Sequence, residues 1–224
     1  MQQYEVEVKS LLGSSEQAEI LRNKIRTLDP RSKCTSKNKQ LNHYFTGGTL
    51  EALVKKIEGH LSPKLHEVLV DLALRATQSS VRTRNKDGEV LLVVKASVGT
   101  DSSANGVARM EFEERVDLTL EQLDQILISA GFRYQAKWSR EREEYAFKDT
   151  TVCLDRNAGY GWLAEFEMVV GTEEEVAAAR ERIAALMQEC GVEELQQERL
   201  ERMFAHYNAH WPEYYGTDKI FTIQ

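Results

Sequence analysis

Alternating polar and apolar residues mark several short segments of the chain as strands. Near the N-terminus the sequence YEVEVK covers residues 4–9. A period of two places Glu5, Glu7 and Lys9 on one face of a strand and the two valines on the other. Taken alone, this pattern indicates only an amphipathic strand whose charged face lies in water. Its recurrence along the chain changes that interpretation.

Four later segments carry like-charged residues at alternate positions. These pairs are Arg82/Arg84, Glu111/Glu113, Arg140/Arg142 and Glu165/Glu167. Solvated strand faces are expected to mix lysine, threonine, serine and glutamine, whereas here all-glutamate pairs are separated from all-arginine pairs. The alternation therefore predicts about eight short strands, mostly antiparallel, that close into a barrel with an ionic interior.

Helical periodicity separates the predicted strands. Capping boxes predict helix starts at Ser14/Gln17, Thr119/Gln122 and Thr172/Glu175. Residues 49–76 indicate a helical pair, residues 33–39 a polar basic loop before a strand at 40–45, and residues 99–106 a flexible loop. The amphipathic helices would cover the apolar outer face of the barrel. We therefore expect an α+β fold, a closed eight-stranded antiparallel β-barrel surrounded by helices.

The bulk properties restrict the class of protein. The chain has 224 residues and no linker rich in Pro, Gly and Ser. This favours one domain over 1–224, with a helical insertion at about 49–76 and a helical, aromatic C-terminal segment at about 172–224. A net charge of −7 argues against an extended nucleic-acid surface. Any anion site must therefore be concentrated locally.

Cysteine usage and hydropathy predict the compartment. Cys34, Cys153 and Cys190 are odd in number and far apart, which fits neither a disulfide framework nor a zinc site. No segment approaches the roughly 20 apolar residues of a membrane span, and the N-terminus lacks a signal-peptide core. We expect a cytoplasmic protein with no membrane partner.

The ionic interior suggests a ligand. One alternative is a self-neutralising network of salt bridges, but burying many charges costs several kcal/mol per ion before pairing, so stability alone is a poor reason for it. Arginine forks match phosphate oxygens, lysines add point charges, and clustered glutamates are hard oxygen ligands for Mg²⁺ or Mn²⁺. Together these groups indicate a metal-bound polyphosphate.

The same residues resemble the motifs of the CYTH superfamily, the triphosphate tunnel metalloenzymes. The matching features are E-x-E-x-K at residues 5–9, R-x-R at 82–84, Lys95, E-x-E at 111–113, R-x-R at 140–142, Asp155 and E-x-E at 165–167. Two features depart from the family pattern: Asn42 replaces an acidic residue in Q-x-D-x-Y-F, and the helical pair at 49–76 is longer than expected. The segment 206–219 carries no motif of the family.

The resemblance implies an eight-stranded tunnel that binds a triphosphate and a divalent metal, either Mg²⁺ or Mn²⁺. It also implies site residues in three roles. The catalytic candidates are Glu5, Glu7, Lys9 and Glu113. The substrate-binding candidates are Lys9, Arg82, Arg84, Lys95, Arg109, Lys137, Arg140 and Arg142. The metal-binding candidates are Glu5, Glu7, Glu111, Glu113, Asp155, Glu165 and Glu167.

The reaction stays open between three alternatives. Hydrolysis of tripolyphosphate, ATP or thiamine triphosphate requires only the charged lining, and is the first choice. An adenylate cyclase of class IV type would attack the α-phosphorus of ATP with the ribose 3′-hydroxyl on the same lining. A polyphosphate-binding module would bind without turnover. The oligomeric state is also open, with a homodimer as one alternative.

Overall fold

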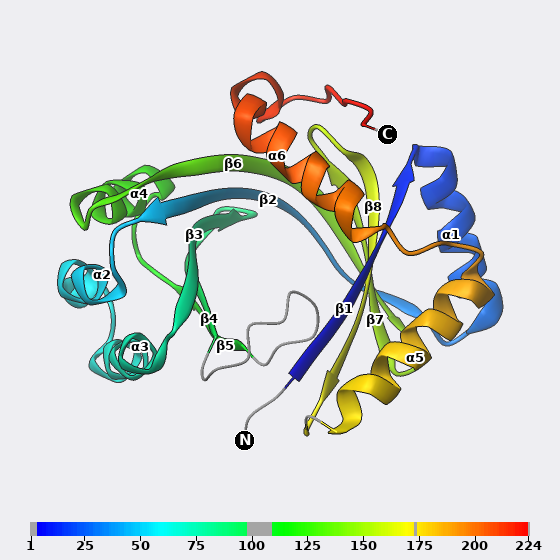
Figure 1. The fold of residues 1–224 in the computed structure, drawn as a ribbon, viewed down its shortest axis with the longest axis horizontal. Coiled ribbons are helices and arrows are strands. Elements are labelled where there is room, and N and C mark those ends of the chain that lie inside the picture. The colour runs from blue at the N-terminus through cyan, green and yellow to red at the C-terminus, as the bar shows by residue number, and fades with distance from the viewer. Residues whose placement is uncertain (1–3, 98–108, 173, 224) are drawn as a thin grey trace. The chain divides into compact units, whose positions relative to one another are not determined.

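The computed structural model describes residues 4–97, 109–172 and 174–223 (Figure 1). The strands are β1 Tyr4–Gly13, β2 Lys33–Gly47, β3 Gln78–Lys86, β4 Glu89–Ser97, β5 Arg109–Arg115, β6 Phe132–Phe147, β7 Thr150–Asn157 and β8 Gly161–Val170. The helices are α1 Ser15–Leu28, α2 Leu50–Ile57, the short 3₁₀ helix η1 Glu58–His60, α3 Pro63–Arg75, α4 Leu120–Ser129, α5 Glu174–Cys190 and α6 Gln197–Tyr214. The fold is therefore of the α+β class.

All eight strands belong to one sheet, in the order β1-β8-β7-β6-β2-β3-β4-β5. The strand pairs with a defined register, such as β1 with β8 and β3 with β4, are antiparallel. In the described ranges the sheet begins at β1 and ends at β5 without a pairing that joins these two strands. The prediction of eight antiparallel strands is confirmed, but the sheet is open, so the predicted closure into a barrel is not.

The chain divides into two compact units. The described residues of unit 1 come from the ranges 1–39 and 139–224, and those of unit 2 from the ranges 40–103 and 108–138. The long strands β2 and β6 contribute residues to both units. Each unit has its own apolar core. The extent of the domain as a whole stays a prediction.

In unit 1, helices α1 and α5 pack on the strands β1, β8 and β7 (Figure 1). Val6 and Val8 of β1 are buried in this core beside Ile25 of α1 and Ile183 of α5. Glu5, Glu7 and Lys9 occupy the alternate positions of the same strand and are only partly buried. The period of two therefore separates apolar from charged side chains as the sequence predicts.

In unit 2, helices α2, α3 and α4 cover one face of β3, β4 and β5. Val81, Leu92, Val94 and Phe112 lie in this core with the buried leucines of the helices. The like-charged pairs of β3 and β5 alternate with these apolar residues, so they occupy the other face of the strands. The apolar layer between helices and strands is what holds this charged face in place.

The prediction of a loop at residues 33–39 is wrong, because this segment forms the first half of β2. Thr35 Oγ1 donates to the Glu144 carbonyl at 3.2 Å, and Lys37 and Lys39 form ion pairs with Glu143 and Glu141 at 3.2 and 2.9 Å. The partner β6 therefore supplies the hydrogen bonds and the counter-charges that this polar segment lacks locally.

Helix starts are confirmed where side-chain caps predict them. Ser14 Oγ accepts from the Gln17 amide at 3.3 Å, and Thr119 and Gln122 form a reciprocal capping box. The predicted loop at 99–106 lies outside the described residues. Among the helices that the structure describes, none combines the length and apolar composition needed to span a membrane.

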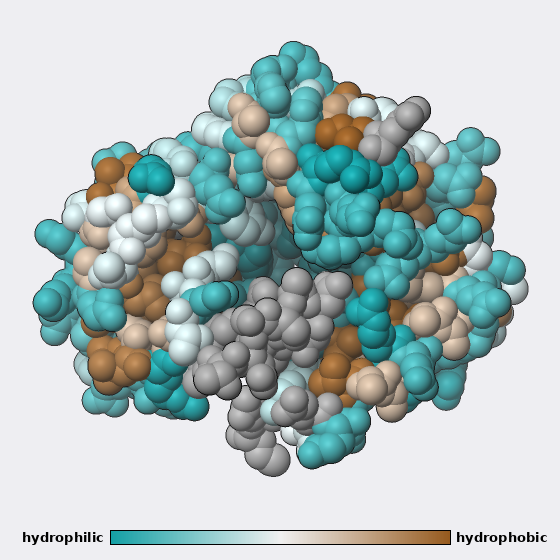
Figure 2. Space-filling view, in the orientation of Figure 1, coloured by the Kyte–Doolittle hydropathy of each residue, from teal (hydrophilic) through white to brown (hydrophobic). Residues whose placement is uncertain are grey.

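The visible surface is mixed in polarity. Figure 2 shows hydrophobic residues in separate patches among hydrophilic ones. Large apolar side chains that are exposed include Leu74 on α3, Val169 on β8 and Ile220 near the C-terminus. These residues belong to different elements, and single exposed apolar side chains are ordinary in soluble domains.

Candidate functional site

The charged face of unit 1 is assembled by the pairing of β1 with β8. In this register Glu7 lies opposite Glu167, Lys9 opposite Glu165, and Glu5 opposite Val169. Residues that lie directly opposite in an antiparallel pair have neighbouring side chains. The two E-x-E motifs, which are about 160 residues apart in the chain, therefore lie on adjacent strands with the same face.

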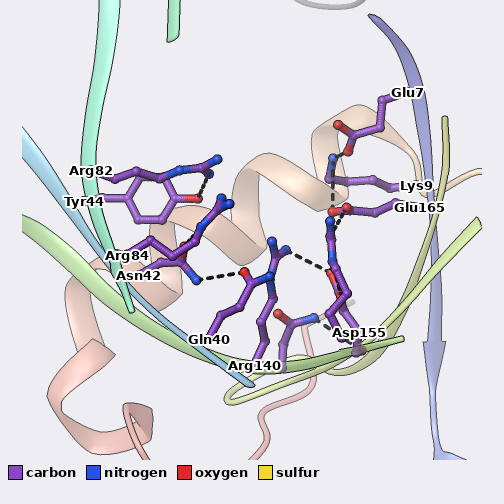
Figure 3. A network of polar contacts seen from close by, with 12 residues as sticks. Glu7, Lys9, Gln40, Asn42, Tyr44, Arg82, Arg84, Arg140, Asp155 and Glu165 are labelled. Carbon is purple, nitrogen blue, oxygen red and sulfur yellow. Dashed lines mark hydrogen bonds and ion pairs between the residues drawn. The ribbon is translucent and has the colours of Figure 1, made fainter. Parts of the chain in front are cut away.

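Lys9 links the carboxylates of this face. Its ammonium group contacts the Glu7 carboxylate and lies 3.5 Å from Glu165 Oε1 (Figure 3). The predicted neighbourhood of Glu7, Lys9 and Glu165 is thus present. In this arrangement Lys9 neutralises glutamates that were expected to bind metal.

Asp155 of β7 holds both arginines of β6. Arg140 Nη1 donates to Asp155 Oδ2 at 2.9 Å, while Arg142 Nε and Nη2 form a fork on the two Asp155 oxygens at 2.7 and 2.6 Å. Arg142 Nη2 also donates to Glu165. The Asp155 side chain is fully buried, so its charge is compensated by these arginines.

The pKa of the Glu165 carboxyl is strongly perturbed. Burial alone would raise its pKa, but the charges of Lys9, Arg142 and Arg140 outweigh burial and hold the pKa of Glu165 well below its usual range. Burial would likewise lower the pKa of the Arg142 guanidinium, and Glu165 and Asp155 raise it instead. Both groups therefore remain ionised in the folded protein.

The metal-binding set is not assembled in this arrangement. In the three described ranges, no three Asp, Glu, His or Cys side chains are placed to hold a metal ion together. The donor chemistry nevertheless fits Mg²⁺ or Mn²⁺, because Glu5, Glu7 and Glu167 offer only carboxylate oxygens from one face of two adjacent strands. The metal roles of these residues and of Glu111, Glu113, Asp155 and Glu165 stay predictions.

In unit 2, both arginines of β3 have neutral side-chain partners on β2. Arg82 Nη1 donates to the Tyr44 hydroxyl at 2.7 Å, and Arg84 Nε donates to Asn42 Oδ1 at 2.8 Å (Figure 3). The register places Tyr44 opposite Arg82 and Asn42 opposite Arg84. Arg84 Nη1 also lies 2.5 Å from Glu113 Oε1.

Arg82 retains an unsatisfied donor. Its Nε is buried and has no hydrogen-bond partner within the described part of the chain. Burial would lower the pKa of the Arg82 guanidinium, but Tyr44, Glu113 and Glu111 raise it, so the charge persists. A buried guanidinium N–H without an acceptor is costly, and an anion that supplies oxygen atoms would remove that cost.

The other substrate-binding candidates of unit 2 differ in their contacts. Lys95 Nζ lies 3.4 Å from Glu111 Oε2, which agrees with their opposed positions on β4 and β5. Lys137 Nζ lies 4.1 Å from the centre of the Tyr134 ring, a cation–π contact. Arg109 occupies the first position of β5. The substrate-binding roles of Lys95, Lys137 and Arg109 stay predictions.

Sequence reasoning did not assign a role to Tyr44 or Gln40. Both residues share the alternate positions of β2 with Asn42, and Asn42 Nδ2 donates to Gln40 Oε1 at 3.4 Å. The period of two was the available signal, since residues 40, 42 and 44 must share a face once the segment is recognised as a strand. Their neutral character gave no sequence signal for the hydrogen bond between Tyr44 and Arg82.

Hydrogen bonds tie the chain before and after the C-terminal helix α6 to strands of unit 1. Before the helix, the Leu195 amide donates to the Lys9 carbonyl at 2.7 Å, and after it the Gly216 amide donates to Ser139 Oγ at 2.9 Å. Ser139 directly precedes Arg140. The segments that flank the helix are therefore hydrogen-bonded to β1 and β6, the strands that carry Lys9 and Arg140.

One family model matches most of the chain. The family model of the CYTH domain matches residues 3–200. The chain belongs to the CYTH family. CYTH enzymes act on triphosphate substrates. No curated protein sequence is significantly similar to this chain.

Solved structures share the CYTH fold at low sequence identity. A candidate adenylate cyclase from Vibrio parahaemolyticus is 16% identical, with a TM-score of 0.61 over 92% of this chain and 99% of that chain. A protein from Pyrococcus horikoshii OT3 is 22% identical, with a TM-score of 0.60 over 91% and 99% of the two chains. A second protein from that organism is 19% identical, with a TM-score of 0.58 over 87% and 92%. At these identities the similarity concerns the fold.

Proposed function

We propose that this CYTH protein is a divalent-metal-dependent triphosphatase. The observation that carries the proposal is the state of Arg82, which is partly buried, charged, hydrogen-bonded to the Tyr44 hydroxyl, and left with a buried Nε that has no partner in the described ranges. Phosphate oxygens are acceptors that match the guanidinium fork in charge and geometry. Arg84 and Lys95 belong to the same unit and would add further positive charge.

Residue chemistry assigns the roles. The arginines of β3 suit phosphate oxygens. Glu5, Glu7 and Glu167 would hold Mg²⁺ or Mn²⁺. The metal, when bound, supplies positive charge to the phosphate oxygens. Because Lys9 contacts Glu7, this lysine would have to exchange Glu7 for a phosphate oxygen.

The reaction follows from an in-line displacement at phosphorus. A water oxygen forms a bond to the terminal phosphorus, the bond from that phosphorus to the bridging oxygen breaks, and a carboxylate accepts a proton from the water. Glu113 is the candidate base. Its carboxylate forms an ion pair with Arg84 in this structure, and a phosphate that binds Arg84 would compete for that guanidinium and release the Glu113 carboxylate to accept a proton.

A product assay tests the proposal against its alternatives. Tripolyphosphate, ATP and thiamine triphosphate are each incubated with Mg²⁺ or Mn²⁺, and orthophosphate, diphosphate and cyclic AMP are quantified. Release of orthophosphate that stops on chelation supports the triphosphatase. Cyclic AMP with diphosphate would identify a cyclase, and tight binding without turnover would identify a binding module.

Arginine variants locate the phosphate-binding group. Arg82→Lys keeps the charge but loses the planar fork, so kcat/KM should fall by about 10- to 100-fold. Arg115→Lys is the matched control in the same unit, because Arg115 is exposed and lies 3.8 Å from Glu89. Equal activity of the two variants would contradict the role assigned to Arg82.

A further inference from the structure

A polar cluster lies buried behind the arginines of unit 2, on the helix-facing side of the sheet. Asp124 of α4 accepts hydrogen bonds from Thr83 Oγ1 at 2.6 Å and from the Tyr134 hydroxyl at 2.7 Å, and His43 Nδ1 lies 2.7 Å from Asp124 Oδ2. His43, Thr83 and Asp124 are at most 3% exposed. A carboxylate can only accept, so His43 Nδ1 must carry a proton.

This cluster shares its strands with the phosphate-binding candidates. In the β2–β3 pair, His43 lies opposite Thr83, and this rung is flanked by the rungs Asn42–Arg84 and Tyr44–Arg82. Side chains of successive residues point to opposite faces of a sheet. The side chains of the His43–Thr83 pair therefore bind Asp124 on one face of the sheet. The two neighbouring residue pairs carry Arg82 and Arg84 on the opposite face.

Packing alone does not account for a charged group at this position. Besides Asp124, α4 buries Leu120, Leu123 and Leu127 in the apolar core of unit 2. Burying a carboxylate is costly unless it is fully hydrogen-bonded, and well-packed apolar residues would stabilise the interface as well or better. Hydrogen bonds differ from apolar contacts in being directional, so this cluster restricts where α4 and the rung can lie.

We propose that Asp124 is a positioning residue for phosphate binding: through Thr83 and His43 it fixes the β2–β3 rung from behind and so sets the placement of Arg82 and Arg84. The effect on catalysis rests on the proposed function. The placement of the two arginines can be measured without substrate. Asp124 itself does not touch the substrate. Tyr134 completes the cluster by occupying the same carboxylate oxygen as His43.

Threonine variants test this arrangement with little change of volume. Thr83→Val removes the hydroxyl that binds Asp124, whereas Thr83→Ser keeps it. Thr150→Val in unit 1 is the matched control, since Thr150 is also a buried strand threonine but its hydroxyl has no hydrogen-bond partner in the described ranges. We expect Thr83→Val to raise KM for tripolyphosphate about tenfold, less than the hundredfold that a 1 Å misplacement can cost. Thr83→Ser should recover most of this loss, and Thr150→Val should match the wild type.

A second measurement separates positioning from folding and from the proposed function. Nitrogen-15 NMR of the arginine Nε–H groups, recorded without substrate, should show Thr83→Val shifting or broadening the signals of Arg82 and Arg84 while those of Arg140 and Arg142 stay unchanged. Unchanged Arg82 and Arg84 signals in a folded Thr83→Val protein would overturn the inference. If the wild type neither binds nor hydrolyses tripolyphosphate, the proposed function fails, and the NMR comparison still decides whether Asp124 positions the arginines.

Discussion

Asn42 Oδ1 accepts a 2.8 Å hydrogen bond from Arg84 Nε, so a neutral amide orients this guanidinium without neutralising it. Glu113 of β5 forms an ion pair with Arg84. The motif of the CYTH family has an acidic residue at the position of Asn42, whereas this chain has a neutral amide there. The difference has a measurable consequence for anion binding.

Asn42→Asp should weaken triphosphate binding. A carboxylate at position 42 would add negative charge beside Arg84, which already pairs with Glu113, and would repel phosphate. A tenfold loss corresponds to about 1.4 kcal/mol. We expect the Kd for a non-hydrolysed tripolyphosphate analogue, measured by calorimetry, to rise at least about tenfold. Asn85→Asp adds the same charge to unit 2 where Asn85 accepts from the Gly88 amide, and serves as control. Equal affinities of the two variants would contradict this explanation.

Asp155→Asn should destabilise the protein strongly. Arg140 and Arg142 both bind this fully buried carboxylate, and removal of one member of a buried ion pair costs roughly 3–5 kcal/mol. Chemical denaturation of the purified variant measures this loss. The control is Asp218→Asn, because Asp218 pairs with Arg156 but is 83% exposed. If the two variants unfold at the same denaturant concentration, the buried pairing is not what stabilises unit 1.

Acid should remove a stabilising contribution of Asp124. Burial would raise the pKa of this carboxyl, but hydrogen bonds from His43, Thr83 and Tyr134 hold the pKa below its usual value. A lowered folded-state pKa gives stability that is present above the unfolded-state pKa of about 3.9 and is lost as the pH falls through the folded-state value.

The difference in unfolding free energy between wild type and Asp124→Asn should therefore be largest at neutral pH and shrink below about pH 4. Denaturation series between neutral and acid pH provide the measurement. Asp71→Asn on the exposed surface of α3 is the control. A difference that stays constant across this range would show that the charge of Asp124 contributes nothing.

Gly159→Ala should disturb the attachment of the C-terminal segment. Gly159 has φ +84°, exchanges backbone hydrogen bonds with the segment at Lys219 and Phe221, and leaves no room for a side chain, since a Cβ would lie 2.7 Å from Tyr207 Cδ2. Gly191 has φ +73°, and a Cβ there would meet open space, so Gly191→Ala isolates the backbone cost of about 1–2 kcal/mol.

Steric overlap at Gly159 should add roughly 1–3 kcal/mol to that backbone cost. The thermal midpoints of both variants measure the difference, and limited proteolysis reports release of the segment after α6. Similar midpoints for the two variants would show that the packing of Tyr207 on Gly159 does not contribute to stability.

The local pattern of the sequence determined the strand faces and the helix starts. The placement of Glu5, Glu7 and Lys9 on one strand face depends only on the alternation of side chains, and the start of α4 depends on the capping box between Thr119 and Gln122. Such features involve neighbours within a few residues, so the sequence alone sufficed for them and for the family resemblance.

The partners of the charged groups were decided by tertiary structure. Residues 33–39 became a strand because β6 supplies their hydrogen bonds, and His43 meets Asp124 across 81 positions of sequence because strand register and helix packing bring them together. The sequence indicated that arginines and glutamates would occupy the charged strand faces. It did not indicate that Asp155 would bind Arg140 and Arg142. Nor did it indicate that Asn42 would bind Arg84 and Tyr44 would bind Arg82. Which cation remains available for an anion depends on these distant pairings, because register is a property of two strands and not of either one alone.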